Sequence, residues 1–180
     1  MNYIKTEISG VRILDPKVFN DARGYFMETF KKEDFEEHIG EINFIQDNES
    51  KSSFGVLRGL HFQRGEFSQA KLVRVIMGKV WDVAVDIRKD SPTFGKYVAV
   101  ELSEENKRQL FIPRGFAHGF LVLSDEVVFC YKVDNAYSPQ NECAILYNDT
   151  DLNINWPIDP SEIIISERYK NAPLLKDYKF

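Results

Sequence analysis

From residue 56 onward, short runs of β-branched and aromatic residues alternate with turn residues, and this succession restricts the fold more than any other feature. Gly78, Gly95 and the triplet Pro113-Arg114-Gly115 are among the residues that separate the runs. The predicted strands cover residues 56–63, 70–77, 80–87, 97–102, 109–112, 119–123, 127–133 and 143–147. Because no helical pattern lies between them, we predict an all-β fold whose antiparallel strands form a closed barrel or jelly roll.

The segments on either side of these runs carry fewer structural signals. Further strands are predicted at residues 11–14, 25–30 and 44–48, a helix over 31–39, and a short peripheral helix within 161–170. A chain of 180 residues without a linker-like stretch suits one domain. We therefore expect a single domain over residues 1–180, with a barrel core at about 54–148 and a C-terminal tail at 149–180.

Charge and cysteine content argue against several classes of protein. The 23 basic and 28 acidic residues give a net charge of −5, so a nucleic-acid backbone is not an expected partner. Two cysteines, Cys130 and Cys143, are too few for a disulfide framework. No signal-peptide-like segment and no apolar run of membrane-spanning length is evident. We expect a cytoplasmic protein with neither a membrane nor a nucleic-acid partner.

The strand over residues 80–87 has two unlike faces. Its odd positions are all apolar, whereas the even positions combine Val80 and Ala84 with the carboxylates of Asp82 and Asp86. By the same alternation, Lys71 and Tyr131 are polar side chains on otherwise apolar strand faces. Such a mixture is typical of a barrel lumen that holds a polar ligand.

Residues 112–120 contain the pattern Pro113-x-Gly115-x-x-His118, which is similar to the second conserved box of cupin barrels. Many cupins bind a metal ion through that histidine together with a His-x-His motif and a glutamate. At the corresponding place this chain reads His61-Phe62-Gln63, so the usual number of ligands is not reached and we expect no metal site. A metal-dependent cupin enzyme stays open as an alternative.

His61, Lys71 and Tyr131 together suggest proton-transfer chemistry. An imidazole accepts a proton near neutral pH, an ammonium stabilises a developing oxyanion, and a phenol returns a proton from the other side. Removal of a proton beside a ketone and its return on the opposite face need this set. A single histidine or tyrosine in a strand is more often structural, and spacing alone does not decide between the two interpretations.

The order of the motifs resembles the dTDP-4-dehydrorhamnose 3,5-epimerase family, and the resemblance covers nearly the whole chain. The matching stretches are 21–28 (DARGYFME), 44–50 (FIQDNES), 55–63 (GVLRGLHFQ), 71–75 (KLVRV), 82–88 (DVAVDIR), 91–95 (SPTFG), 112–120 (IPRGFAHGF), 131–132, 148–149 and 154–157 (INWP). It implies a cupin-type jelly roll, or double-stranded β-helix, and an isomerase that uses no metal and no organic cofactor. Its substrate is a dTDP-linked 4-keto-6-deoxyhexose.

The resemblance also implies residue roles. His61 is the base at C3 and then C5, Tyr131 is the acid on the other face, and Lys71 holds the C4 oxygen. The expected substrate-binding residues are Arg23, Phe26, Glu28, Gln46, Asn48, Arg58, His118 and Tyr137. The family forms homodimers in which the N-terminal segment of one subunit reaches its partner's site, so the N-terminal strands are expected to form the dimer.

Two features of the chain qualify this resemblance. The family usually carries an aspartate that orients the histidine where this chain has Tyr169, so Asp82 or the Tyr169 hydroxyl is expected to orient His61 instead. Strict alternation would turn Arg58 and His61 to different faces unless Gly59 forms a bulge. Epimerisation at one carbon only, on a related 4-keto sugar nucleotide, and a non-catalytic sugar-nucleotide-binding module stay open as alternatives.

Overall fold

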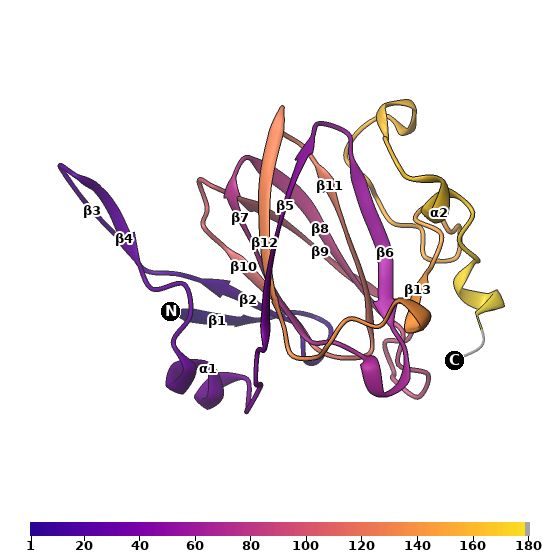
Figure 1. The fold of residues 1–180 in the computed structure, drawn as a ribbon, viewed down its shortest axis with the longest axis horizontal. Coiled ribbons are helices and arrows are strands. Elements are labelled where there is room, and N and C mark those ends of the chain that lie inside the picture. Colours follow the sequence, from indigo (N-terminus) through magenta and orange to yellow (C-terminus); the bar gives the residue numbers. More distant parts are fainter. Residues whose placement is uncertain (179–180) are drawn as a thin grey trace.

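A computed structural model describes residues 1–178 and contains two facing antiparallel sheets and a separate hairpin (Figure 1). The six-stranded sheet has the order β1 (Asn2–Lys5), β2 (Arg12–Asp15), β10 (Gln109–Ile112), β7 (Lys71–Met77), β12 (Glu126–Val133) and β5 (Gln46–Ser53). The five-stranded sheet has the order β13 (Glu142–Ala144), β6 (Leu57–Gln63), β11 (Phe116–Val122), β8 (Lys79–Asp86) and β9 (Tyr97–Ser103). This arrangement is the predicted cupin-type jelly roll.

Alternation along the strands builds the core between the two sheets. Val80 and Ala84 of β8 lie in the inner cluster, which they share with residues of β7, β11 and β12. Their odd-numbered neighbours Val83 and Val85 lie in a different cluster, on the outer face of the five-stranded sheet. Of the polar side chains predicted for the lumen, Lys71 and Tyr131 line a cavity between the sheets and Asp82 is buried against His118. Asp86 is bound separately, by the loop that follows β8.

Peripheral segments cover the outer face of each sheet. The C-terminal segment contributes Leu152 and Leu175 to the cluster outside the five-stranded sheet. Helix α1 (Lys32–His38) buries Phe35 against Leu72 and Phe111 of the six-stranded sheet. The remaining short helices are η1 (Gly65–Phe67), η2 (Pro139–Asn141), η3 (Pro160–Glu162), α2 (Glu167–Lys170) and η4 (Leu175–Asp177). None of the helices in residues 1–178 combines the length and apolar character of a membrane span.

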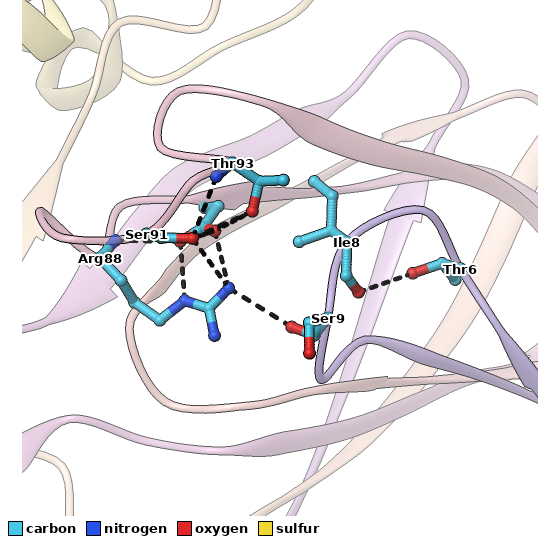
Figure 2. Close-up of polar contacts among 7 residues, drawn as sticks. Thr6, Ile8, Ser9, Arg88, Ser91 and Thr93 are labelled. Atoms are coloured by element: carbon cyan, nitrogen blue, oxygen red, sulfur yellow. Dashed lines mark hydrogen bonds and ion pairs between the residues drawn. The ribbon is translucent and has the colours of Figure 1, made fainter.

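A polar anchor joins the β8–β9 loop to the turn between β1 and β2. The carboxylate of Asp86 is fully buried and accepts hydrogen bonds from the side chains of Arg88, Ser91 and Thr93 at 2.6–2.8 Å. Arg88 also donates to the carbonyl of Ser9 at 3.3 Å (Figure 2). A buried carboxylate that accepts several hydrogen bonds is stabilised in its charged form, so this anchor fixes the loop to the N-terminal segment.

Strands β3 (Val18–Asp21) and β4 (Gly24–Met27) form a hairpin that projects away from the two sheets (Figure 1). Most predicted barrel strands are confirmed with small shifts at their ends. Strand β1 was not predicted, and the strand expected at residues 44–48 instead spans Gln46–Ser53. Strand β5 lies at a sheet edge and its sequence is almost wholly polar, so hydrophobic alternation could not reveal its length.

Candidate active site

A cavity of about 210 Å³ opens between the two sheets at the polar end of the core. Side chains from both sheets and from the C-terminal segment form its wall. They include Arg58, His61, Lys71, His118, Tyr131, Tyr137, Glu142 and Tyr169. The predicted trio of His61, Lys71 and Tyr131 thus lies around one cavity. His61 lies on β6 of the five-stranded sheet, and Lys71 and Tyr131 lie on β7 and β12 of the facing six-stranded sheet (Figure 1).

A β-bulge in β6 brings Arg58 and His61 to the same cavity. His61 pairs with His118 and Arg58 pairs with Phe120, so two residues of β6 stand opposite the single Gly119 of β11. Gly59, within the bulge, has φ 121°, and a Cβ atom there would lie 2.5 Å from the His118 carbonyl oxygen. The local backbone therefore requires glycine, and the predicted bulge is confirmed.

Lys71 and Tyr131 project from the facing six-stranded sheet. Tyr131 pairs with Val73, and Lys71 lies two residues from Val73, so both side chains share the inner face of that sheet. The Nζ atom of Lys71 lies 3.0 Å from Nε2 of His61, and this hydrogen bond crosses the cavity from one sheet to the other. The second imidazole nitrogen of His61, Nδ1, is buried and has no hydrogen-bond partner among residues 1–178.

Burial sets the protonation states of this pair. It lowers the pKa of His61 well below 6.5, and the nearby positive charge of Lys71 lowers it further. Burial also lowers the pKa of Lys71 to about 8, although the charges of Asp82 and Glu142 oppose this shift. At pH 7 the imidazole is therefore neutral and the amine is an ammonium, so Lys71 donates the hydrogen bond and the His61 proton resides on Nδ1.

His118, in the cavity wall, and Asp82, behind it, form a second buried pair. Both carboxylate oxygens of Asp82 lie 3.0 Å from Nε2 of His118, and both side chains are almost completely buried. Burial raises the pKa of Asp82 and lowers that of His118. Asp82 was one of two groups expected to orient His61, but its carboxylate binds His118 instead. His118 is the diagonal neighbour of Asp82 on the adjacent strand β11, and both side chains lie on the inner face of the five-stranded sheet.

Glu142 is the main site residue that the sequence did not indicate. It lies on β13, which pairs with β6, and its carboxylate accepts hydrogen bonds from Arg168 at 2.8 Å, from Tyr169 at 3.5 Å and from Tyr137. It is the only acidic side chain in the wall of the cavity among residues 1–178. The stretch before it, Ser-Pro-Gln-Asn, reads as a loop, and only the pairing of β13 with β6 shows where this carboxylate points.

The other predicted binding residues divide into two groups. Arg58 and Tyr137 lie at the mouth of the cavity, where Arg58 Nε donates to Ser52 Oγ at 3.0 Å. Five other predicted binding residues lie outside this cavity. Arg23, Phe26 and Glu28 lie on or beside the projecting hairpin.

Gln46 and Asn48 lie on the edge strand β5 and are hydrogen-bonded to each other at 2.7 Å. Arg23 binds Asp21 at 2.6 Å, and Phe26 is 66% exposed.

Comparison with known proteins gives consistent results. The family model described as dTDP-4-dehydrorhamnose 3,5-epimerase matches residues 5–177. The dTDP-4-dehydrorhamnose 3,5-epimerase of Shigella flexneri is 61% identical over 159 residues, which are 88% of each chain.

Solved structures agree with the sequence comparison. The dTDP-4-dehydrorhamnose 3,5-epimerase of Elizabethkingia anophelis superposes with a TM-score of 0.96 at 52% identity, covering 100% of this chain and 99% of that one. A second structure is the dTDP-6-deoxy-D-glucose 3,5-epimerase of Legionella pneumophila in complex with dTDP-4-keto-L-rhamnose. It superposes with a TM-score of 0.94 at 49% identity, covering 97% of this chain and 93% of that one.

Proposed function

Because the chain belongs to the dTDP-4-dehydrorhamnose 3,5-epimerase family, we propose that it inverts C3 and C5 of dTDP-4-dehydro-6-deoxy-D-glucose to give dTDP-4-dehydro-L-rhamnose. One observation carries this proposal beyond family membership. His61 enters the cavity from one sheet, whereas Lys71 and Tyr131 enter from the facing sheet. A base and an acid on opposite walls are what inversion at a carbon beside a ketone requires.

The first step is removal of the C3 proton by His61. The electron pair of the C3–H bond forms a C3–C4 double bond, and the C4 carbonyl becomes an enolate oxygen. Lys71 supplies the positive charge that stabilises this oxygen. The low pKa of the imidazole keeps it in the neutral, proton-accepting form at pH 7, because burial and the Lys71 charge both disfavour the imidazolium.

Lys71 also controls when His61 is free to act. Without substrate, the Lys71 ammonium donates to the Nε2 lone pair of His61 at 3.0 Å, so the base is occupied. A substrate carbonyl in the cavity offers the ammonium a second acceptor. When Lys71 turns to that oxygen, the Nε2 lone pair becomes available to the C3 proton. Binding of the ketone and exposure of the base are thereby coupled through one side chain.

Tyr131 completes each inversion by donating its phenolic proton to the opposite face of the enolate. Burial raises the pKa of Tyr131, so the phenol is protonated at neutral pH. After donation, the phenolate recovers a proton and His61 loses one through solvent, which restores both groups for the same sequence of steps at C5. Arg58 and Arg23 bind the diphosphate by charge-assisted hydrogen bonds.

The same proposal includes a homodimer with exchanged hairpins. Arg23, Phe26 and Glu28 have no place in the cavity of their own chain, and the hairpin exposes Phe19, Tyr25 and Phe26 to 50%, 55% and 66%. Aromatic side chains on a projecting hairpin fit a partner's surface better than solvent. Each chain is one cupin domain over residues 1–180, and its two free cysteines, Cys130 and Cys143, are consistent with the reducing cytoplasm.

Solvent deuterium exchange tests the reaction. The substrate is incubated with enzyme in heavy water, and label at C3 and C5 is followed by NMR. We expect label at both carbons with wild-type enzyme and none with His61→Ala. Label at C3 alone would show a monofunctional 3-epimerase, and no label at either carbon would refute the proposed reaction.

Complementation tests the exchanged hairpins. His61→Ala and Arg23→Ala dimers are inactive or weak alone, and they are mixed, dissociated and reassociated. If each hairpin serves the partner, every mixed dimer has one site with both an intact His61 and an intact Arg23. Random mixing then restores about a quarter of wild-type activity, because half of the dimers are mixed. No recovery in dimers shown to have mixed would contradict the exchange.

A further inference from the structure

The His61 ring is held by only one hydrogen bond within the described part of the chain. Its Nε2 contacts Lys71 at 3.0 Å, and its buried Nδ1 has no partner among residues 1–178. One hydrogen bond leaves an imidazole free to rotate about its Cβ–Cγ bond. A base that must align with two different carbons needs a fixed ring plane, so other contacts must provide it.

Two rings flank the imidazole. The His118 ring lies 5.8 Å from the His61 ring, at 66°, and the Tyr169 ring lies 6.2 Å away, at 31°. His118 is itself fixed by Asp82. Tyr169 belongs to α2, which packs against β6, the strand that carries His61. The phenol, tilted by 31° to the imidazole, therefore limits the rotation of the imidazole on the side of the C-terminal segment.

The Tyr169 ring is itself held in place by Glu142. The Tyr169 hydroxyl donates to Glu142 Oε1 at 3.5 Å, and the neighbouring Arg168 donates to Glu142 Oε2 at 2.8 Å. Glu142 lies on β13, where Ala144 pairs with His61, so the carboxylate and the imidazole are carried by adjacent strands. Burial and the charge of Glu142 raise the pKa of Tyr169, which keeps the phenol neutral.

We propose that Tyr169 is a positioning residue whose ring fixes the plane of the His61 imidazole, while Glu142 holds the phenol through its hydroxyl. This inference rests on the proposed role of His61 as the base. It assigns the orientation of His61 to ring packing and not to a hydrogen bond from a carboxylate at Nδ1. The hydroxyl of Tyr169, which was expected to contact His61, is directed to Glu142 instead.

Two substitutions at position 169 separate the contribution of the ring from that of the hydroxyl. Tyr169→Phe keeps the ring and loses the tether, so we expect kcat to fall about threefold. Tyr169→Ala loses the ring, so kcat falls about 10- to 100-fold, as for other residues that orient a functional imidazole, with KM nearly unchanged. Lys170→Ala, an exposed neighbour paired only with Glu167 in the described structure, is the matched control and keeps wild-type kcat.

Tyr169→Asp gives a readout that a merely structural role would not move. A carboxylate beside the imidazole stabilises the imidazolium, so the acid limb of the kcat/KM profile moves to higher pH by about one unit or more. Wild-type kcat in Tyr169→Ala, or an equal loss in Tyr169→Phe and Tyr169→Ala, would overturn the role of the ring.

NMR of labelled histidine, without substrate, keeps this inference separate from the proposed reaction. We expect one sharp set of His61 ring signals in the wild type and in Lys170→Ala, and broadened signals in Tyr169→Ala. Sharp, unshifted His61 signals in Tyr169→Ala would overturn the positioning role, even if the enzyme proved to act on another substrate. Absence of label in the deuterium experiment with wild-type enzyme would instead refute the proposed epimerisation. The NMR signals of His61 would still test whether Tyr169 positions the imidazole.

Discussion

Replacing Lys71 by methionine should stabilise the folded protein at neutral pH while abolishing its activity. The Lys71 side chain is 6% exposed, and burial lowers the pKa of its ammonium from 10.5 to about 8. At about 1.36 kcal/mol for each pH unit, this difference means that the buried charge costs about 3 kcal/mol below pH 8. Methionine has a similar length and no charge, so it avoids that cost and still fills the space.

The sign of the pH dependence makes this prediction specific. Between pH 8 and 10.5 the unfolded chain binds a proton at Lys71 that the folded chain has released, so wild-type stability rises with pH relative to the variant. Urea denaturation is measured at pH 7 and at pH 10.5. Lys71→Met should be about 3 kcal/mol more stable than the wild type at pH 7, and the difference should fall below about 0.5 kcal/mol at pH 10.5.

The exposed lysine Lys89 provides the control, because Lys89→Met removes a charge that folding does not bury. Its stability should follow the wild type at both pH values. A Lys71→Met protein that is less stable than the wild type at pH 7 would refute the reasoning. A stability difference that does not change between the two pH values would refute it as well, because packing and not charge would then be its source.

Three further predictions concern the alkaline limb of activity, the Asp86 anchor and the β6 bulge. The kcat/KM profile should fall on its alkaline side near pH 8, where Lys71 loses its proton. Because the charge of Asp82 raises the pKa of Lys71, Asp82→Asn should move this alkaline limb to lower pH. An alkaline limb that does not move would contradict the coupling between Asp82 and Lys71. Burial raises the pKa of Asp86, but hydrogen bonds from Arg88, Ser91 and Thr93 outweigh burial and lower the pKa to about 2. The anchor therefore contributes about 2.5 kcal/mol to the free energy of unfolding, and this contribution is lost as the pH falls from about 4 to 2. Asp86→Asn should therefore be less stable than the wild type at pH 6 in chemical denaturation, and a gap of the same size at pH 2 would argue against this account. Gly59→Ala should lose about 1–3 kcal/mol of stability in thermal unfolding, because φ is positive at this position and the new Cβ would lie 2.5 Å from the His118 carbonyl oxygen. Wild-type stability of this variant would show that the bulge relaxes to accept a side chain.

The barrel could be predicted from sequence because its strands alternate strongly. The run that contains Val83 and Val85 is apolar on one face and mixed on the other, and both faces lie where alternation places them. The edge strand β5 could not be delimited, because its residues are polar and alternate only between exposed and half-buried positions. Strand propensity reflects how well side chains pack on a half-buried sheet surface. An edge strand whose two faces are both polar therefore shows neither strong strand propensity nor hydrophobic alternation.

The trio of the site could be named from sequence, but its surroundings could not. Lys71 and Tyr131 stood out as polar side chains on apolar faces, and the cavity contains both. Glu142 carries no local pattern, and its place depends on β13 pairing with a strand about 80 residues earlier in the chain. For Asp82, the inner face of the sheet was predicted correctly, but the hydrogen-bond partner was not, since the carboxylate binds His118. Alternation predicts the face on which a side chain lies, but not which neighbouring side chain it contacts.

The stereochemistry of exchange in Tyr131→Phe tests the central claim most directly, namely that a base and an acid act on one sugar from opposite walls. The variant retains His61 and Lys71, and it is incubated with the substrate in heavy water while label and configuration at C3 are followed by NMR. We predict label at C3 with retained configuration, because His61 still removes the proton and returns deuterium to the same face. Inversion at C3 at the wild-type rate would contradict the account.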